Sequence, residues 1–331
     1  MDLNWTLLEN GAIDQAWDEV AASSPGATFF QTRAWANLLC TTFPHWRPDP
    51  VVIEFSDGNL MVLPMLRRLH VGHRASMLPN VYGGPLFRRP PDERHLEAIE
   101  KVPRWYPNIT LLDNPFSPYG WEADGLVKWR CWTQVTDLSP GFATLWKNFR
   151  KGHRNGFKVA QRNGITVTIA TRQPEVDAYY EVYRDSLRRW GKEATGFYPR
   201  ELFRRLLQMP EYGKNVRLWL AHRDGKVIGG LVMLYQSLHA VTWHGSTHSA
   251  YMSLQAETLL SLTAMKAACQ EGFHWFDFMA NNSSMAGVAR FKEGFASERR
   301  KYNSYYLRSP LGRAFDQYSA LKERYLRRCP L

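Results

Sequence analysis

The spacing of apolar and polar positions is most informative in residues 242–295. A β-favouring run leads into a polar segment at residues 244–249, and apolar residues then recur at helical spacing up to Gly272, where a helix C-cap is expected. The apolar run FHWFDFM follows, and it is typical of a strand buried on both faces. The pattern therefore predicts a β-α-β unit whose chemistry lies at the carboxyl ends of its strands, in residues 244–249 and 277–284.

The rest of the pattern predicts the same order of elements in both halves of the chain. Each half offers two helices, a hairpin closed by an Asp-Gly turn, and a final strand, helix and strand. In the first half we expect helices at 12–22 and 32–40, with Thr32 as an N-cap, and a hairpin turn at 56–59. In the second half we expect helices and strands at 165–170, 175–190, 199–208, 216–222, 227–235 and 239–243. No residue-level repeat accompanies this symmetry.

A break at residues 137–141 divides these two series. We predict an N-terminal domain, residues 1–137, and a C-terminal domain, residues 138–331. The second domain begins with a basic linker helix, which we expect to be interrupted at Gly152, and ends with a basic C-terminal helix. The fold class is therefore α/β of the α+β kind, with a mixed, mostly antiparallel sheet flanked by helices in each domain.

Composition agrees with two folded domains. The chain has 331 residues, of which 44% are apolar, and it has no apolar run of membrane-spanning length. Its first 20 residues carry acids where a signal peptide needs a basic region, so we expect a cytoplasmic protein. The cysteines are too far apart in sequence to predict a zinc site or a disulfide framework: Cys40, Cys131, Cys269 and Cys329. We predict no metal site.

The positive charge is concentrated in two segments. The net charge is +11, and residues 138–174 hold seven Lys or Arg and no acid, whereas residues 283–331 hold eleven Lys or Arg and four acids. Such segments favour an anionic partner, which includes nucleic acid, a phosphorylated substrate, a nucleotide cofactor or a membrane surface. The alternative is a set of solvated helix faces.

Several segments together resemble a known family. They are FFQTRAW, FRKGHRNGFKVAQRNGI, VIGGLVMLY, WHGSTHSAYM, EGFHWFDFM and GVARFKEGF, and they span nearly the whole chain. With the order of elements, they resemble the FemAB-like acyltransferases of the GNAT (N-acetyltransferase) superfamily, including peptidoglycan-bridge aminoacyltransferases and a related acetyltransferase domain. The resemblance implies tandem GNAT-like domains. The coiled-coil insertion of the larger cell-wall members has no counterpart here, so their substrates are not carried over.

The resemblance implies an N-acyl or aminoacyl transferase that forms an amide on an amine of an anionic acceptor. No tightly bound cofactor is expected, and the co-substrate is acyl-CoA or aminoacyl-tRNA. Acyl-CoA needs a Gly-rich turn for its pyrophosphate, but HGSTHSAYMSLQAET has the single glycine Gly245, so aminoacyl-tRNA fits better. Expected partners are a small-molecule or cell-envelope-precursor amine and tRNA, with peripheral membrane contact but no DNA. The alternative is a non-catalytic protein that binds RNA or an anionic membrane.

Three residues are candidates for catalysis. Lys292 of RFKEGF is expected to stabilise an oxyanion or a phosphate. His244 is either a base or a structural histidine, and Asp277 either accepts the proton of the amine or caps a turn. We expect the segments with His244 and Lys292 to project into one groove between the domains. The candidate substrate-binding residues are Arg150, Lys151 and Arg154 for phosphates, Tyr82, Gly83 and Gly84 for the acceptor, and Trp243, Gly245, Ser246, Arg290 and Phe291 beside the site.

Overall fold

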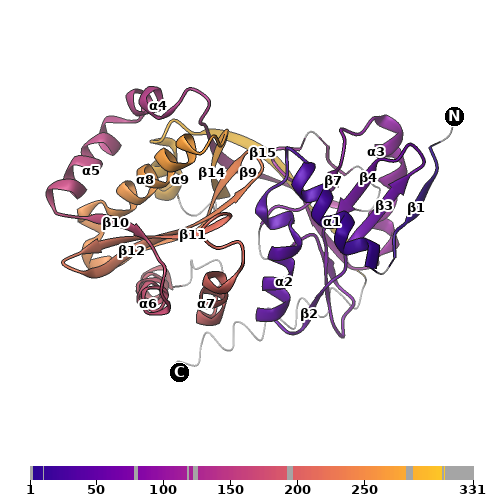
Figure 1. Cartoon of the computed structure of the whole chain (residues 1–331), viewed down its shortest axis with the longest axis horizontal. Helices are drawn as coiled ribbons and strands as arrows, with labels where there is room; N and C mark the ends of the chain where they lie inside the picture. Colours follow the sequence, from indigo (N-terminus) through magenta and orange to yellow (C-terminus); the bar gives the residue numbers. More distant parts are fainter. Residues whose placement is uncertain are drawn as a thin grey trace. The chain divides into compact units, whose positions relative to one another are not determined.

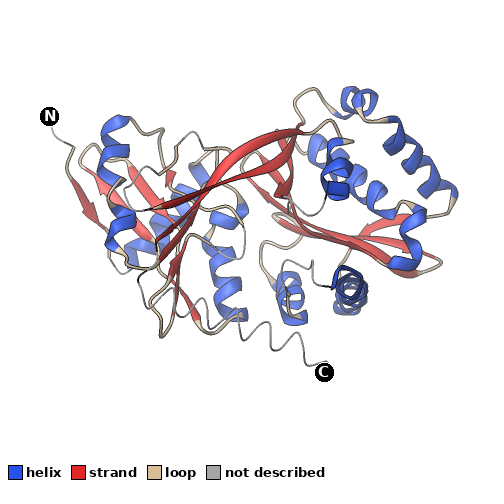
Figure 2. Ribbon diagram, turned by 180° about the vertical axis from the view of Figure 1, so that it is seen from behind, coloured by secondary structure: helices blue, strands red, loops and turns tan. Residues whose placement is uncertain are grey.

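The computed structural model describes residues 3–9, 11–77, 81–117, 119–121, 126–191, 197–280, 286–307 and 309 (Figure 1). The chain forms two compact units. Unit 1 comprises Met1–Ser24, Phe30–Arg130 and the chain from Tyr302 onward, and unit 2 comprises Pro25–Phe29 and Cys131–Lys301. Two long strands, β9 (Val127–Asp137) and β15 (Glu298–Leu307), each contain residues of both units (Figure 2). These two units are defined by compactness alone. The domain bounds 1–137 and 138–331 therefore stay predictions.

Unit 2 is built on one mixed sheet with the strand order β10-β11-β12-β13-β14-β9. All neighbouring strands in this series are antiparallel except β13 and β14, which are parallel. The sequence between β13 and β14 forms the helix α8 (Ala256–Gln270), so the predicted β-α-β unit is confirmed. The other strands are β10 (Thr166–Ile169), β11 (Val216–Arg223), β12 (Lys226–Gln236), β13 (His239–Thr247) and β14 (Trp275–Ala280).

Helices cover both faces of the sheet in unit 2. The helices α6 (Gln173–Trp190) and α7 (Arg200–Gln208) lie on one face, and α4 (Phe142–Asn148), α5 (Lys151–Arg162) and α8 lie on the other (Figure 1). The hydrophobic core of this unit includes Leu231, Met233, Leu260, Met265 and Phe276. Burial of these side chains is the main favourable term that holds the layers together.

The strand β13 is longer than its sequence predicts. The prediction that residues 244–249 form a loop is wrong for residues 244–247. There β13 continues to Thr247 and pairs with Gly229 and Gly230 of β12. The polar composition of this segment does not predict a strand. The segment is extended because it pairs with β12, not because of its local propensity. A β-bulge at Trp243 interrupts the register, because Val232 faces His244 whereas Met233 faces Thr242.

The strands β13 and β14 pair over only three residues each. The parallel register joins residues 239–241 to residues 275–277, and no pairing follows beyond Val241 and Asp277 among the described residues. The two strands therefore separate at their carboxyl ends. This is the edge at which the sequence pattern predicts the candidate chemistry.

Unit 1 contains helices and shorter strands in the predicted order. One sheet has the strand order β1-β3-β4-β7, and β15 pairs with β8, which is followed by β6, β5 and β2. Thr32 caps α2 as predicted, since its side chain accepts a hydrogen bond from the Trp35 amide. The elements are β1 (Trp5–Leu7), α1 (Gly11–Ser23), η1 (Phe29–Gln31), α2 (Arg33–Thr42), β2 (Trp46–Pro48), β3 (Val51–Phe55), β4 (Leu60–Leu63), β5 (Leu66–Arg68), β6 (Arg74–Ala75), β7 (Leu86–Phe87), α3 (Glu93–Ile99), η2 (Val102–Trp105) and β8 (Ile109–Leu112).

The basic segment differs from its prediction in one respect. The helix breaks at Phe149 and Arg150, between α4 and α5, and not at Gly152. Phe149 is buried against Phe295, and its extended backbone lets the side chain enter the core. The helix α9 (Ala286–Glu293) then carries the RFKEGF segment. Most of the predicted basic C-terminal helix lies outside the described residues. Among the described helices none is long and apolar enough to cross a membrane.

Candidate active site

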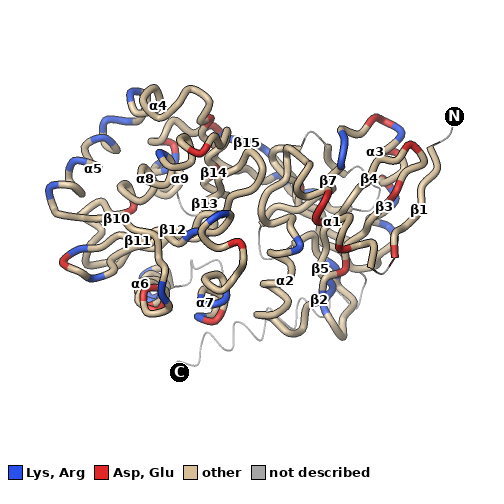
Figure 3. The backbone as a smooth tube through the Cα atoms, viewed as in Figure 1, with Lys and Arg blue, Asp and Glu red and all other residues tan. Residues whose placement is uncertain are grey.

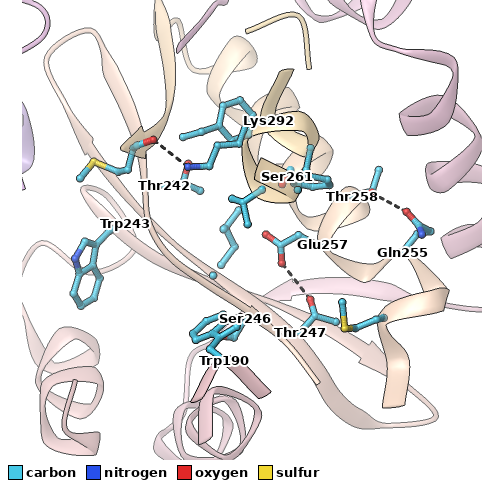
Figure 4. Close-up of a pocket in the computed structure, with 18 of the residues that line it drawn as sticks. Trp190, Thr242, Trp243, Ser246, Thr247, Gln255, Glu257, Thr258, Ser261 and Lys292 are labelled. Atoms are coloured by element: carbon cyan, nitrogen blue, oxygen red, sulfur yellow. Dashed lines mark hydrogen bonds between the residues drawn. The ribbon is translucent and has the colours of Figure 1, made fainter. Parts of the chain in front are cut away.

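A cavity of about 570 Å³ lies in unit 2 at the point where β13 and β14 separate (Figure 4). Its walls come from β13, β14, the first turns of α8, the helix α9 and the end of α6. Most of the lining is apolar, with a few polar groups that converge on the space, as in binding sites for organic molecules. The polar and charged lining residues are Arg189, Thr242, Ser246, Thr247, Gln255, Glu257, Thr258, Ser261 and Lys292.

Lys292 brings a positive charge to this cavity. Its Nζ donates hydrogen bonds to the backbone carbonyls of Met279, at 3.0 Å, and Ala280, at 3.5 Å. An ammonium has three N–H groups, so the contacts with the described residues leave one for a ligand. Burial lowers the pKa of Lys292 to about 8, while the charges of Asp277 and Glu257 act in the opposite direction. Lys292 therefore stays charged at neutral pH.

Glu257 brings a negative charge to the same cavity, and the sequence analysis missed it. The side chain comes from the first turn of α8, and its Oε2 accepts a hydrogen bond from Thr247 Oγ1 at 3.2 Å. A Cβ on Gly245 would lie 3.2 Å from Glu257 Oε1, so this glycine leaves room for the carboxylate. Burial raises the pKa of Glu257 to about 7, opposed by Thr247 and Lys292. The sequence did contain a signal for Glu257, which is an acid in the first turn of a helix that follows the central strand.

His244 lies on the other face of the sheet and does not line the cavity. The Tyr179 hydroxyl hydrogen-bonds its Nδ1 at 2.6 Å, and the rings of Tyr183 and Phe203 pack against it. Burial lowers its pKa to about 3, so the ring is neutral at physiological pH. Alternation along β13 separates it from Lys292, although both residues belong to unit 2. The expectation that both project into one groove does not match this placement.

Asp277 is fully buried on β14 beneath Lys292. Its Oδ1 accepts hydrogen bonds from Thr133 Oγ1, at 2.6 Å, and from the Met279 amide, at 2.7 Å. Met279 has a φ of 61°, a left-handed conformation that this hydrogen bond helps to hold. The arrangement corresponds to the turn-capping alternative for Asp277. Its charge also favours the protonated form of Lys292.

The other predicted site residues divide into three groups. Trp243, Gly245, Ser246 and Phe291 line the cavity, whereas the side chain of Arg290 is exposed outside it. Lys151 is also exposed on α5. Tyr82, Gly83 and Gly84 are buried in unit 1, where Gln31 Nε2 donates hydrogen bonds to the Gly83 carbonyl, at 2.8 Å, and the Gly84 carbonyl, at 3.2 Å.

The basic segment also holds α9 in place. The guanidinium of Arg150 forms an ion pair with Glu293 at 3.2 Å, and Arg154 donates to the carbonyls of Lys147 and Phe149. His153 Nε2 hydrogen-bonds the Phe291 carbonyl at 2.8 Å. These contacts fix the helix that carries Lys292. The remaining Lys and Arg of α4 and α5 lie along helices that carry no acid (Figure 3).

A family model described as an acetyltransferase (GNAT) domain matches residues 147–293. This range contains the cavity and both charged residues. The chain carries a GNAT acyltransferase domain. The predicted GNAT-superfamily resemblance is therefore confirmed for this range. No curated protein sequence matches the chain.

Solved structures extend the likeness in fold over both units. A crystal structure of FemX is 10% identical with a TM-score of 0.65, and the match covers 91% of this chain and 96% of FemX. A tandem GNAT protein from the clavulanic acid biosynthesis pathway is 12% identical with a TM-score of 0.54, covering 92% and 97%. A C-terminal domain assigned to a lysylphosphatidylglycerol synthetase of Agrobacterium fabrum is 14% identical with a TM-score of 0.53, covering 94% and 97%. The predicted tandem GNAT-like fold is confirmed.

The GNAT domain thus holds an acid and a base of matched strength in one cavity. A carboxyl group with a pKa of about 7 and an ammonium with a pKa of about 8 are both suited to proton transfer and charge stabilisation near neutral pH. In the described part of the chain, this cavity brings the two groups together.

Proposed function

We propose that this enzyme transfers an acyl or aminoacyl group to a primary amine and forms an amide bond in the cavity between β13 and β14. The observation that carries this proposal is the shared placement of Glu257 and Lys292 in one largely apolar space. A low-dielectric cavity strengthens the interactions of both charges with a reacting group.

In this mechanism Glu257 acts as the general base. An aliphatic amine has an ordinary pKa near that of Lys, roughly 10.4, so it arrives mostly as an ammonium ion. The carboxylate of Glu257 takes one proton from it, and the neutral nitrogen then attacks the carbonyl carbon of the donor. The carbonyl oxygen gains negative charge, and the free N–H of Lys292 donates to it. The intermediate collapses to the amide: Glu257 gives the proton that it holds to the leaving oxygen or sulfur and takes a second proton from the attacking nitrogen, and this second proton is released to solvent before the next cycle.

An anionic acceptor is supported by the charge of the chain. The net charge is +11, and the helices α4 and α5 carry basic residues and no acid near the domain that holds the cavity. A positive surface raises the local concentration of an anionic substrate. We therefore propose an amine on a cell-envelope precursor or a lipid headgroup as the acceptor. The name of the lysylphosphatidylglycerol synthetase is consistent with an anionic lipid as the carrier of the acceptor group.

The donor is proposed to be an aminoacyl ester such as aminoacyl-tRNA. The turn after β13 has no Gly-x-Gly pattern for a pyrophosphate. The carboxylate of Glu257 fills the space beside Gly245 on the cavity side. The carboxylate of Asp185, which accepts a hydrogen bond from the Ser249 amide in this turn, disfavours a phosphate group there because like charges repel.

The proposal is tested by incubating the protein with radiolabelled aminoacyl-tRNAs or acyl-CoAs and a panel of amine acceptors. Wild type is compared with Lys292→Ala, Glu257→Gln and the control Lys266→Ala, which removes an exposed lysine of α8. We expect amide formation by wild type and the control, and a loss of at least a hundredfold in the two site variants. RNA or liposome binding without transfer, equal in all four proteins, would instead support a binding protein and would overturn the proposal.

A further inference from the structure

The threonine hydroxyls that line the cavity of unit 2 are already used by the protein. Thr242 Oγ1 donates a hydrogen bond to a backbone carbonyl of β14 at 2.7 Å, and Thr247 Oγ1 donates to Glu257 at 3.2 Å. Thr258 Oγ1 donates to Gln255 Oε1, also at 3.2 Å. A hydroxyl has only one O–H to give, so a ligand in the cavity finds these three donors engaged.

Ser261 of α8 presents a hydroxyl that the protein does not use. The residue lines the cavity and is only 1% exposed, and its Oγ forms no hydrogen bond with any residue that the structure describes. Ser246, the other serine of the lining, differs, because alternation along β13 places its side chain with His244 on the opposite face of the strand. A buried hydroxyl without a partner is unfavourable, and a ligand that bonds Ser261 would explain why it is there.

Ser261 follows Glu257 by one turn of α8. Side chains four residues apart on a helix lie on the same face, with their Cβ atoms about 5–6 Å apart. Figure 4 shows Ser261, Glu257 and Lys292 around the same part of the cavity. A group bound to Ser261 is therefore close to any carbon atom that lies between the two charges.

Much of the remaining cavity wall is aromatic. Four elements of the unit each contribute one ring, and these are Trp190, Trp243, Phe278 and Phe291. A charged group buried against such rings loses its hydrogen bonds to water without replacement, whereas an apolar group gains free energy. The cavity of about 570 Å³ is many times the roughly 30 Å³ that a water molecule occupies in the liquid, so it has room for a branched or aromatic side chain.

We propose that the transferred group is an apolar α-aminoacyl group, such as leucyl, and that Ser261 is the residue that recognises its α-amino group. The inference rests on the proposed function in one respect, which is that the acyl carbon lies between Glu257 and Lys292. In an aminoacyl group the α-amino nitrogen is two bonds from that carbon, which agrees with the one-turn spacing of Ser261 and Glu257. The apolar side chain of the group then packs against the aromatic wall.

The experiment measures binding by calorimetry, with no acceptor present. The probes are aminoacyl-adenosines in which an amide replaces the ester, so that no transfer is possible. A leucyl probe is compared with an isocaproyl probe, which lacks only the α-amino group, and with glycyl and lysyl probes. The first comparison reports on Ser261, and the others report on the aromatic wall.

Four proteins are compared: wild type, Ser261→Ala, Ser261→Cys and the control Thr263→Val. Thr263 lies on α8 outside the cavity lining, and its Oγ1 donates to the Leu259 carbonyl at 2.8 Å. The control therefore removes a hydroxyl from the same helix without changing the cavity. The Cys variant keeps the size of the side chain, and its thiol is only a weak hydrogen-bond partner.

We expect wild type and the control to bind the leucyl probe about tenfold more tightly than the isocaproyl probe, and at least tenfold more tightly than the glycyl and lysyl probes. Ser261→Ala should bind the leucyl and isocaproyl probes equally, with its affinity for the isocaproyl probe unchanged from wild type. Ser261→Cys should lose most of the difference, and it decides the question if the Ala variant does not fold.

Three results would overturn the inference. They are equal binding of the leucyl and isocaproyl probes by wild type, binding of the lysyl probe as tight as that of the leucyl probe, and an equal loss for every probe in Ser261→Ala, which would show a structural role for the hydroxyl. None of these measurements depends on transfer, so failure here and failure of the proposed function are distinguishable.

Discussion

Both units contain two helices followed by an Asp-Gly hairpin, but they differ in the strand, helix and strand that come after it. In unit 2, β13 and β14 diverge around a cavity of about 570 Å³, and a 15-residue helix connects them. In unit 1, the α-helix between β7 and β8 is α3, which has seven residues, and these two strands lie in different sheets. Buried polar side chains in this unit include Gln31 and Asn114, which hydrogen-bond each other at 3.0 Å.

The difference is the reason why the proposed chemistry is assigned to unit 2. The cavity in unit 1 is smaller, about 210 Å³, and its two acids, Glu97 and Glu100, are exposed on α3. No lysine lines it, whereas Glu257 and Lys292 face each other across the cavity in unit 2. Equivalent substitutions are therefore expected to change activity in unit 2 and the free energy of unfolding in unit 1.

The largest effect is expected from Glu257→Gln. The amide keeps the shape of the side chain but does not accept a proton, so the transfer rate should fall by roughly 10²- to 10⁴-fold. The control is Glu93→Gln, which alters the acid in the first turn of α3, the helix of unit 1 that follows β7. Initial rates of amide formation at saturating donor measure both. Equal rates for the two variants would remove Glu257 from the mechanism.

A pair of glycine substitutions comes next. A Cβ on Gly83 of unit 1 would lie 2.2 Å from the Ser76 carbonyl oxygen, so Gly83→Ala must displace buried backbone. We expect a loss of about 1–3 kcal/mol in the free energy of unfolding. In unit 2, a Cβ on Gly245 would meet only the side-chain ends of Leu231, at 3.1 Å, and Glu257, at 3.2 Å. Gly245→Ala should therefore leave stability nearly unchanged and reduce transfer.

Denaturant unfolding and initial rates separate these outcomes. We expect Gly83→Ala to be unstable but active while it is folded. We expect Gly245→Ala to be stable but impaired in transfer. If Gly245→Ala costs as much stability as Gly83→Ala, the glycine of β13 serves packing instead of the cavity. If Gly83→Ala is neutral, unit 1 is more plastic than its buried hydrogen bonds indicate.

The pH profile of transfer is expected to have a maximum between pH 7 and 8. Glu257, with a pKa of about 7, must lose its proton to act as a base, so the rate falls below that pH. Lys292, with a pKa of about 8, must keep its proton, so the rate falls above that pH. Each limb should change about tenfold per pH unit. Lys292→Arg should move the alkaline limb upward, because a guanidinium stays charged.

The acceptor amine also titrates and needs its own control. Two acceptors with different amine pKa values are compared in the same buffers. If the limbs of the pH profile shift with the pKa of the acceptor amine, the assignment of the limbs to Glu257 and Lys292 is contradicted.

Much of the fold could be predicted from local sequence, because periodic burial is a local signal. The N-cap Thr32, the Asp-Gly hairpins and the helix ending before Gly272 all have such signals, and each is present in the structure. The end of β13 was missed because its polar residues are held in a strand by the glycines of β12, which are distant in sequence.

The site was only partly predictable for the same reason. Lys292 was proposed from the resemblance of RFKEGF, but Glu257 has no motif of its own. Its raised pKa comes from burial against β13, which only the folded chain provides. The bulge at Trp243 decides which side chains of β13 face the cavity, and no local pattern predicts the register shift that turns His244 toward α6.

The smallest effect concerns Asp113, a buried carboxyl group of unit 1. Its Oδ2 accepts hydrogen bonds from Asn303 Nδ2, at 3.1 Å, and Tyr305, at 3.0 Å, while its Oδ1 has no hydrogen-bond partner in the described part of the chain. Burial raises its pKa to about 6, although those hydrogen bonds and the charge of Lys128 lower it. The folded state thus holds the proton more tightly than the unfolded state does.

The sign of the pH dependence follows from this shift. Because the folded pKa is the higher one, stability falls as the pH rises from about 4 to about 6, and the full penalty is present above pH 6. Asp113→Asn keeps an oxygen for Asn303 and Tyr305 and removes the buried charge, so it should raise the free energy of unfolding at pH 8 by about 1 kcal/mol. Near pH 4 the two proteins should be nearly equal. Urea unfolding at both pH values measures this, and a variant less stable than wild type at pH 8 would show that Oδ1 binds a group that needs the charge.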